Sequence, residues 1–245
     1  MTTNYNAIAH EYQCSKQQPW RHYIECFTLF ELIGELADKE VLDLACGEGY
    51  FTRQLKERGA AGVVGVDLST SMIELASKQE SEQLLGIEYR VGDAKNLRFD
   101  ERFDLVVAGY LLNYAASREE LLAMCRTIAD CLKPGCRFVS VNNNPAQSRA
   151  DFSLGRPYGF VKGADEEPRD GTPIVWTFFL DEGPFSITNY QLGISTHEAV
   201  FAEAGFRNVD WYAPRLMPDG AAMYGEAYWA DFMQHPPITF IECWR

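Results

Sequence analysis

The residues best placed to do chemistry lie in one short turn, with the sequence V-L-D-L-A-C-G-E-G over residues 41–49. Small residues let the backbone approach a ligand closely, and a helix starting near Tyr50 would direct its free N–H groups at the same place. The dinucleotide frame G-x-G-x-x-G ends here in Thr52. Asp43 and Glu48 would also repel a pyrophosphate, and no P-loop Gly-Lys-Ser/Thr is present. The turn therefore predicts a nucleoside with a positively charged group rather than a dinucleotide.

Two further acids follow the next predicted strands. Asp67 ends the apolar run 61–66, where a carboxylate can accept both hydroxyls of a ribose. Asp93 follows the run 87–91, where it could accept from the exocyclic amine of a purine. Each acid alone could simply cap a helix. Together with Asp43, at the same edge of successive strands, they favour a binding site.

Short apolar runs alternate with helical periodicity through the first part of the chain. The predicted strands are residues 40–44, 61–66, 87–91, 103–108 and 137–141, and the predicted intervening helices are residues 50–58, 69–79 and 117–132. Ser69 and Ser71 are equally good caps for the second helix, and Ser117 with Glu120 has capping-box spacing for the third. This alternation predicts an α/β fold with a doubly wound parallel sheet.

The second part of the chain is organised differently. Residues 144–173 are rich in Pro, Gly and charge and predict a loop insertion, and the aromatic runs 174–180 and 185–192 predict a hairpin. We expect this insertion, residues 144–193, to be a lid. Ser195 and Glu198 predict a capped helix to Ala204, followed by a strand at 207–212, a helix at 225–233 and a last strand at 238–244.

Composition narrows the class of protein. The chain has 245 residues and a formal net charge of −13, which argues against nucleic acid or an anionic membrane as the main partner and suits a neutral or cationic small molecule. No secretory signal and no bilayer-spanning run is visible, and the seven cysteines form no C-x-x-C pair. We expect a single cytoplasmic domain over residues 1–245, with reduced thiols and no metal site; the oligomeric state stays open.

These motifs resemble those of class I S-adenosylmethionine-dependent methyltransferases. The block 41–49 is similar to that family's first motif, V-V-G-V-D-L-S at 63–69 to its ribose motif, G-D-A at 92–94 to its adenine motif, and F-D-L-V-V-A at 103–108 to its fourth-strand motif. Residues 132–135, L-K-P-G, look like the loop before the fifth strand. The resemblance covers about residues 37–143. It implies a seven-stranded, mostly parallel sheet of order 3-2-1-4-5-7-6 with the last strand antiparallel.

The resemblance also implies which residues hold the cofactor, S-adenosyl-L-methionine. Its methionyl part would lie against Asp43 and the backbone from Ala45 through Gly47 and Gly49, and Asp67 would take the ribose hydroxyls. The adenine would be bound by the remaining cofactor residues, which are Asp93 with the Ala94 amide, and Leu68 and Met72 flanking the ring.

The N-terminal segment, residues 1–30, resembles the Y-x-x-I-A-x-x-Y opening of small-molecule members, in which it caps the cofactor. Tyr12 and Arg21 are its cofactor candidates, Arg21 as a partner of the cofactor carboxylate. Tyr5 is its candidate for contact with the acceptor and for catalysis. More loosely, the whole chain resembles toxoflavin-pathway enzymes, which N-methylate a small heteroaromatic.

The acceptor is accordingly predicted to be a small, flat heteroaromatic metabolite, methylated on nitrogen rather than oxygen or carbon. An aromatic wall suits such a ring. The candidate acceptor residues are Tyr5, Trp20, Asn113, Tyr114, Asn142, Tyr158, Trp176 and Tyr190. His197 is the only histidine placed to act as a general base and is the second catalytic candidate.

Two other classes of protein remain open from the sequence. One is a non-catalytic nucleoside-binding regulatory module that keeps the fold, which the intact turn and the aromatic insertion disfavour. The other is an NAD-dependent oxidoreductase, which Thr52 and Asp43 disfavour.

Overall fold

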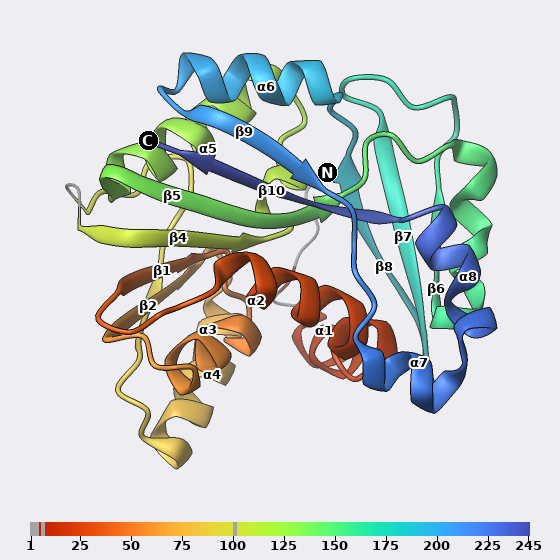
Figure 1. Ribbon diagram of the computed structural model, residues 1–245, viewed down its shortest axis with the longest axis horizontal. Helices are drawn as coiled ribbons and strands as arrows, with labels where there is room; N and C mark the ends of the chain where they lie inside the picture. The colour runs from red at the N-terminus through yellow and green to blue at the C-terminus, as the bar shows by residue number, and fades with distance from the viewer. Residues whose placement is uncertain (1–4, 6–7, 100–101) are drawn as a thin grey trace.

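A computed structural model of the chain describes residues 5, 8–99 and 102–245 (Figure 1). Residues 1–4 and 6–7 of the predicted N-terminal cap, and residues 100–101, lie outside the described residues. Within the described ranges, no helix is both long enough and apolar enough to cross a bilayer.

A seven-stranded sheet forms the centre of the molecule, and its neighbouring strands follow the order β3-β2-β1-β4-β5-β10-β9. All pairs are parallel except those of β10, which runs antiparallel to both β5 and β9. The strands are β1 (Glu40–Leu44), β2 (Gly62–Asp67), β3 (Glu88–Val91), β4 (Phe103–Gly109), β5 (Leu132–Asn143), β9 (Arg207–Tyr212) and β10 (Ile238–Trp244). The predicted doubly wound sheet and its strand order are confirmed.

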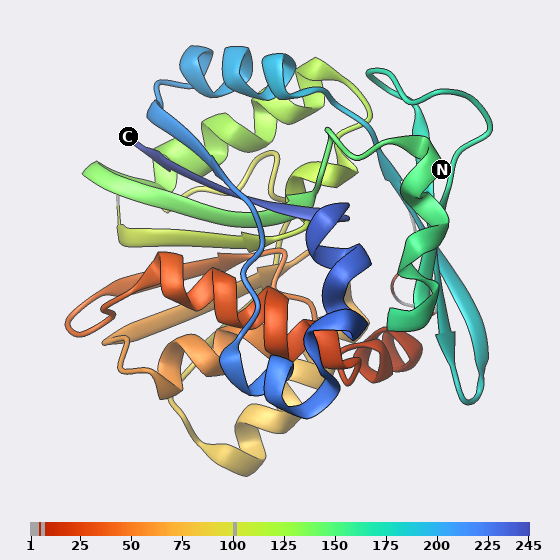
Figure 2. The same ribbon diagram turned by 45° about the vertical axis from the view of Figure 1, so that its right-hand side comes forward.

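Helices cover both faces of this sheet (Figure 2). Because side chains alternate along a strand, Val41 of β1 faces one core with α2 (Phe27–Ile33) and α3 (Tyr50–Glu57), while Leu42 faces the other. The second core is closed by α5 (Arg118–Cys131) and α6 (Ile194–Glu203). α4 (Thr70–Gln83) packs on β2 and β3.

Side-chain caps begin two helices where the sequence predicts them. Ser69 caps α4 by accepting from the Met72 N–H, and Ser117 caps α5 by accepting from the Glu120 N–H.

The predicted capping box at Ser195 is wrong. Helix α6 begins at Ile194 after Gly193, and no side chain of the predicted box caps it. The carboxylate of Asp170 accepts instead from the Gly193 N–H at 2.6 Å and also from the Thr196 hydroxyl. The cap therefore comes from a residue distant in the sequence.

The insertion after β5 folds into a three-stranded antiparallel sheet, called here the small sheet. It comprises β6 (Phe160–Gly163), β7 (Pro173–Leu180) and β8 (Gly183–Tyr190), preceded by the 3₁₀ segment η4 (Arg149–Tyr158). The predicted hairpin corresponds to β7 and β8, but the sequence did not predict β6. Since β6 is four residues long and contains Lys162, its strand character depends on pairing with β7.

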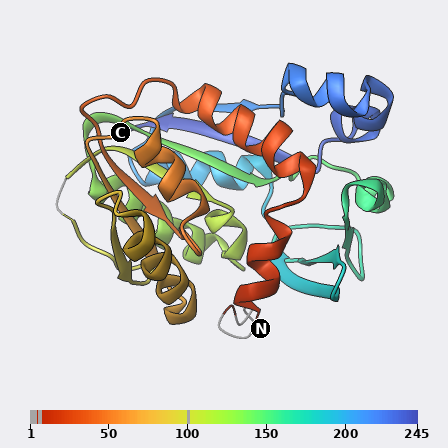
Figure 3. The ribbon, with the colours of Figure 1, turned by 90° about the horizontal axis from the view of Figure 1, so that it is seen from below.

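The N-terminal helices lie between the central sheet and the small sheet (Figure 3). They are α1 (Ala9–Ser15) and the π-helical turn η2 (Arg21–Cys26), which continues into α2. The short segment η3 (Leu111–Tyr114) follows β4 and contacts both β5 and β8. Two helices precede β10: α7 (Pro218–Tyr224), which was not predicted, and α8 (Glu226–Gln234), which was.

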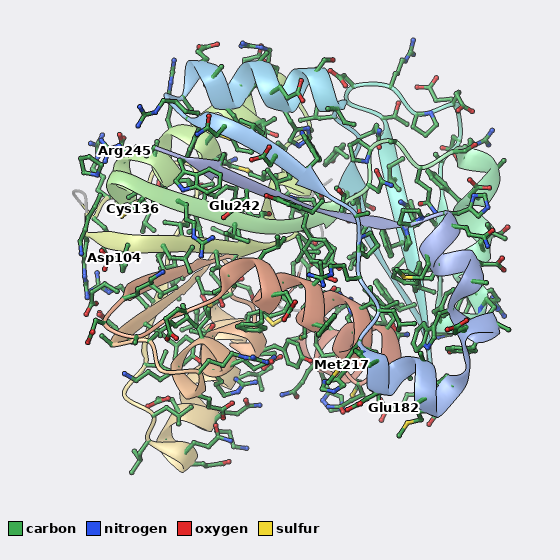
Figure 4. The ribbon with its side chains drawn as sticks, in the orientation of Figure 1. Asp104, Cys136, Glu182, Met217, Glu242 and Arg245 are labelled. Carbon is green, nitrogen blue, oxygen red and sulfur yellow. The ribbon has the colours of Figure 1, made fainter. Side chains whose placement is uncertain are left out.

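The two ends of the central sheet differ in what surrounds them (Figure 4). Asp104, Cys136 and Arg245 mark one end, where β4 and β5 begin and β10 finishes. Glu182, in the turn between β7 and β8 of the small sheet, and Met217, which directly precedes α7, lie toward the other end. The carboxyl ends of the parallel strands open at this second end, and the candidate site lies there.

Candidate functional site

A cavity of about 310 Å³ opens at the carboxyl ends of β1, β2 and β4. The predicted site residues that line it are Tyr5, Tyr12, Ala45, Gly47, Asp67, Leu68, Met72, Asp93, Ala94, Tyr114 and Tyr190. Residues that the sequence analysis did not single out also line it, among them Lys95, Tyr110, Leu111, Glu120 and Met124. The cavity thus collects side chains from the first four strands, the N-terminal segment and the small sheet.

The turn after β1 has an unusual backbone conformation that leaves space beside it. Ala45 and Gly47 both have positive φ, 62° and 57°, in a region that L-residues with a Cβ seldom occupy. The Gly47 N–H donates to Asp67 Oδ2 at 2.8 Å, which ties the turn to the end of β2. A Cβ on Gly47 would contact the Tyr12 ring at 3.8 Å, so glycine leaves the space between turn and ring free for a ligand.

Asp67 is fixed in place before any ligand arrives. Its Oδ1 accepts from the Ser69 N–H at 2.8 Å, while its Oδ2 takes the Gly47 N–H. Burial raises the pKa of Asp67, and the two backbone hydrogen bonds partly counter that rise by favouring the carboxylate. Each carboxylate oxygen retains a further lone pair, so Asp67 can still accept two hydroxyl donors.

One end of the cavity forms an apolar slot with acids at its edge. Leu68 is 67% exposed despite its size, and Met72 beneath it is buried. Leu111 and Met124 also line this cavity, while Asp93 is fixed by accepting from the Lys95 N–H at 2.9 Å. An exposed leucine at the rim of a slot of this kind suits a flat ring stacked on it.

Asp43 and Gly49 shape the turn from beneath and do not line the cavity. Thr52 donates to Asp43 Oδ2 at 2.6 Å, and Asp43 Oδ1 is buried without a partner among the described residues. Gly49 caps α3, and a Cβ there would overlap the Tyr89 hydroxyl. Asp43 thus supports the turn from outside the cavity lining, and its predicted contact with the methionyl part stays a prediction.

Burial raises the pKa of Asp43 to about 7, from an ordinary 3.8. The folded chain therefore holds this proton more tightly than the unfolded chain, and stability falls as pH rises between these values. Asp43→Asn keeps the shape of the side chain and removes its charge. As pH rises from about 4 to about 8, the unfolding free energy of the variant should therefore increase relative to that of the wild type by roughly 2–4 kcal/mol. Urea unfolding across this pH range, with exposed Asp130→Asn as control, measures it. A difference independent of pH would contradict the assignment.

Three tyrosines meet at the mouth of the cavity. The hydroxyls of Tyr5 and Tyr114 are hydrogen-bonded to each other, and the Tyr5 ring packs edge-on against Tyr12 with centroids 5.1 Å apart. Tyr190, from the end of β8, also lines the cavity. Burial raises the pKa of Tyr5 and of Tyr114 well above their ordinary value, so both are neutral phenols at physiological pH.

Arg21 does not line this cavity, and its predicted pairing with the cofactor carboxylate is corrected. It is 2% exposed, and its Nη1 donates to Glu25 Oε2 at 2.5 Å and to the Tyr110 hydroxyl at 3.2 Å. Glu25 is fully buried and also accepts from the Tyr110 hydroxyl. The charge of Arg21 is therefore already neutralised within the fold.

Lys16 is the buried cation that sequence reasoning missed. Its Nζ lies 4.9 Å from the Tyr12 ring centroid and 5.9 Å from that of Tyr110, and both rings line the cavity. The rings of Phe51 and Tyr50 complete the cage at 5.3 and 5.5 Å. Across the described part of the chain, no carboxylate pairs with Lys16. Its position one helical turn after Tyr12 was the available signal.

Three predicted acceptor residues support the structure instead of lining the cavity. Asn113 Oδ1 accepts from the Asn143 N–H at 3.3 Å, and Asn142 Nδ2 donates to Ser140 Oγ at 2.8 Å. The Tyr158 hydroxyl donates to the Tyr228 carbonyl at 2.7 Å, inside the aromatic packing between η4 and α8. Trp20 and Trp176 line a different, smaller cavity.

His197 is not placed to act as a base. Its ring lies in α6, with Nδ1 3.0 Å from the Gly193 carbonyl, and packs edge-on against Trp211 of β9. Burial lowers its pKa, which keeps the imidazole neutral. Because α6 packs against β9 at the edge of the sheet, this histidine is structural.

Comparison with known proteins agrees with this geometry. Residues 41–135 match a family model described as a methyltransferase domain. The chain is 27% identical over 174 residues to N-demethylindolmycin N-methyltransferase of Streptomyces griseus, covering 69% of this chain and 70% of that protein. It is 34% identical over 112 residues to a ubiquinone biosynthesis O-methyltransferase of Coxiella burnetii, covering 44% of this chain and 46% of that protein. The chain thus spans about half the length of this second relative.

The fold has close structural counterparts as well. An S-adenosylmethionine-dependent methyltransferase from Mesorhizobium loti superposes with a TM-score of 0.63 at 22% identity, over 90% of this chain and 97% of that one. The chain therefore contains a methyltransferase domain and has the fold of S-adenosylmethionine-dependent methyltransferases. S-adenosylmethionine is accordingly the cofactor against which its cavity is compared.

The cavity fits this cofactor. The turn at Gly47 leaves space for a ligand, and the carboxylate of Asp67 can accept from hydroxyls. The exposed Leu68 offers a surface on which a ring can stack. The acids Asp67 and Asp93 also suit a cationic ligand. Among the described residues, no cluster of His, Cys, Asp or Glu is suited to a metal ion.

Proposed function

We propose that this protein transfers a methyl group from S-adenosylmethionine to a nitrogen of a small, flat heteroaromatic metabolite. The observation that carries the proposal is the group of tyrosines that line the cofactor cavity, Tyr5, Tyr12, Tyr114 and Tyr190. Aromatic walls accommodate a planar acceptor, and residues 144–193 would serve as the lid over it. The narrower resemblance to toxoflavin-pathway enzymes is part of this proposal, and the 27% identical N-methyltransferase supports it.

The choice of nitrogen rests on the absence of a free base beside the tyrosines. Among the described residues that line the cavity there is no histidine or cysteine, and burial raises the pKa of Tyr5 and Tyr114. The carboxylates of Asp67 and Asp93 accept from backbone N–H groups, and Glu120 accepts from the Ala116 N–H and pairs with Lys95. A phenolic acceptor would need to lose its proton at attack, whereas an aromatic nitrogen already offers a lone pair. Alignment and exclusion of water then supply much of the rate enhancement.

Within this proposal, each cofactor contact has a residue of suitable chemistry. Asp67 accepts the ribose hydroxyls, and Asp93 and the Ala94 amide bind the adenine. Lys16 does not itself line the cavity, but it lies against the rings of Tyr12 and Tyr110, which do, and its unpaired positive charge favours the cofactor carboxylate in place of Arg21. When bound, the cofactor would supply a methyl group carried on a sulfonium. The acceptor nitrogen would give its lone pair to that methyl carbon as the carbon–sulfur bond breaks, the sulfur would keep the bonding pair as a neutral thioether, and any N–H proton would pass to solvent. Tyr5 and Tyr114 hold the acceptor in line.

Methyl-labelled cofactor distinguishes this proposal from its alternatives. We expect label on ring nitrogens in a panel that pairs heteroaromatics such as quinazolinone with phenols such as naphthol. Label on phenols alone would contradict nitrogen transfer. Binding of S-adenosylhomocysteine without transfer to any member would favour the regulatory module.

A further inference from the structure

A second, smaller cavity adjoins the tyrosines of the main one. It encloses about 10 Å³, enough for one water-sized group, and shares Tyr12, Tyr110 and Tyr114 with the main cavity. Its opposite wall comes from β7 and β8 of the small sheet and from the end of β5. We call it the inner chamber. A molecule placed against Tyr114 in the main cavity could direct one edge into it.

The inner chamber contains buried polar atoms that the fold leaves unsatisfied. Asn143, the last residue of β5, is 7% exposed, and neither its Nδ2 nor its Oδ1 has a hydrogen-bond partner among the described residues. The same holds for Trp176 Nε1. Since a buried polar group without a partner costs about 1–3 kcal/mol, these atoms indicate a ligand or a bound water.

Asn189 adds to this set from an otherwise apolar surface. The inner face of the β7–β8 hairpin is built from residues paired across it: Ile174 with Asn189, Trp176 with Ile187, and Phe178 with Phe185. Asn189 is the one amide on this face and is 1% exposed. Its side chain lies near the Tyr114 hydroxyl and lowers that phenol's pKa, yet its Nδ2 makes no hydrogen bond of normal geometry.

In the described part of the chain, the one charged side chain that lines the inner chamber is already paired, so the chamber favours a neutral ligand. Arg21 lines it, but the buried carboxylate of Glu25 already pairs with its guanidinium. Within this ion pair, Arg21 Nε and Glu25 Oε1 are buried without a hydrogen-bond partner among the described residues. The chamber therefore offers hydrogen-bond donors without a free charge.

The unsatisfied atoms that line the chamber are mostly donors. Asn143 Nδ2, Asn189 Nδ2, Trp176 Nε1 and Arg21 Nε donate, and Asn143 Oδ1 accepts. A carbonyl oxygen is the complementary group, because it accepts from several donors and occupies the space of one water-sized group. We propose that Asn143, Asn189 and Trp176 form an acceptor-recognition site that binds the carbonyl oxygen of a lactam on a neutral heteroaromatic acceptor.

This inference rests on the proposed function, because it assigns the acceptor of the same site. With its lactam carbonyl oxygen in the inner chamber, the ring lies against Tyr114, and the opposite side of the ring faces the main cavity. The bound oxygen also replaces the hydrogen bonds of any water that fills the chamber in the free protein.

Matched ligand pairs test the assignment. Quinazolinone and quinolone carry the lactam edge, whereas quinazoline and quinoline have nearly the same shape without it. We expect calorimetric titration of the wild-type protein, with and without saturating S-adenosylhomocysteine, to show at least 10-fold tighter binding of the lactam members. Asn143→Leu and Asn189→Leu should each remove most of this preference while S-adenosylhomocysteine affinity stays within 2-fold.

Ile174→Val is the matched control, since Ile174 pairs with Asn189 on the same inner face and does not line the chamber. It should keep the lactam preference. Thermal unfolding checks that each variant is folded; Asn189→Leu extends an apolar face and should fold. Equal binding of both members, binding of neither, or a preference that survives both leucine variants would overturn the inference. If the wild-type protein did not bind S-adenosylhomocysteine, the proposed function would be overturned instead. The titration of the ligand pairs without S-adenosylhomocysteine would still test the chamber.

Discussion

Asp67→Ala is expected to weaken the binding of S-adenosylhomocysteine by at least about 100-fold, because two hydrogen bonds to a charged group contribute roughly 1.5–3 kcal/mol each. The carboxylate is already oriented by the N–H groups of Gly47 and Ser69, so little entropy is lost when the ribose hydroxyls bind. Isothermal titration of the folded variant measures the change.

The control for Asp67→Ala is Asp130→Ala, which removes the same charge from the exposed side of α5. It should bind S-adenosylhomocysteine as the wild type does. A tenfold change in affinity corresponds to roughly 1.4 kcal/mol. If the affinity of Asp67→Ala for S-adenosylhomocysteine stayed within about 3-fold of the wild-type value, the ribose assignment would be wrong.

Arg21→Met is expected to destabilise the fold by about 3–5 kcal/mol, because it leaves the carboxylate of Glu25 buried without its ion-pair partner. Removing both charges in Arg21→Met/Glu25→Leu should recover much of this loss, since a buried pair replaced by apolar groups is often nearly neutral. Urea unfolding gives both values. The double variant should bind S-adenosylhomocysteine with wild-type affinity, because neither residue lines the cofactor cavity.

Lys16→Met separates the two cations of the N-terminal segment. Because Lys16 has no carboxylate partner in the described part of the chain, its loss should cost less than about 1 kcal/mol of stability. It should nonetheless weaken S-adenosylhomocysteine binding by at least about 10-fold, because it removes the unpaired positive charge that lies behind the cavity-lining rings of Tyr12 and Tyr110. The reverse pattern, with affinity lost in the Arg21 variants and kept in Lys16→Met, would restore Arg21 as the carboxylate partner.

The sheet and its cofactor edge were predictable because they depend on local patterns. Apolar runs such as 103–108 mark strands buried on both faces, and Ser69 and Ser117 begin helices through contacts within one turn. Asp67 and Asp93 follow their strands directly, so strand order alone brings them to one edge. These features need no knowledge of how distant segments pack.

The errors occurred where a residue's partner is remote in sequence. Ser195 was predicted to cap α6, but the carboxylate of Asp170 from the insertion takes that role. His197 was predicted as a base from its place after the hairpin, but α6 packs it against Trp211. In both cases the local pattern was compatible with the prediction, and a long-range contact decided otherwise.

The sequence by itself determined the fold class and the cofactor edge, since these follow from periodicity and from acids that directly follow strands, and the resemblance of its motifs to a known family implied the type of reaction. Only the tertiary structure decided which N-terminal cation is free, because Glu25 pairs with Arg21 and aromatic rings enclose Lys16. It also decided that Asn143 and Asn189, which stand on different sheets, border one chamber. The physical reason is that burial and pairing of a polar group depend on the elements packed around it, and spacing along the chain does not specify them.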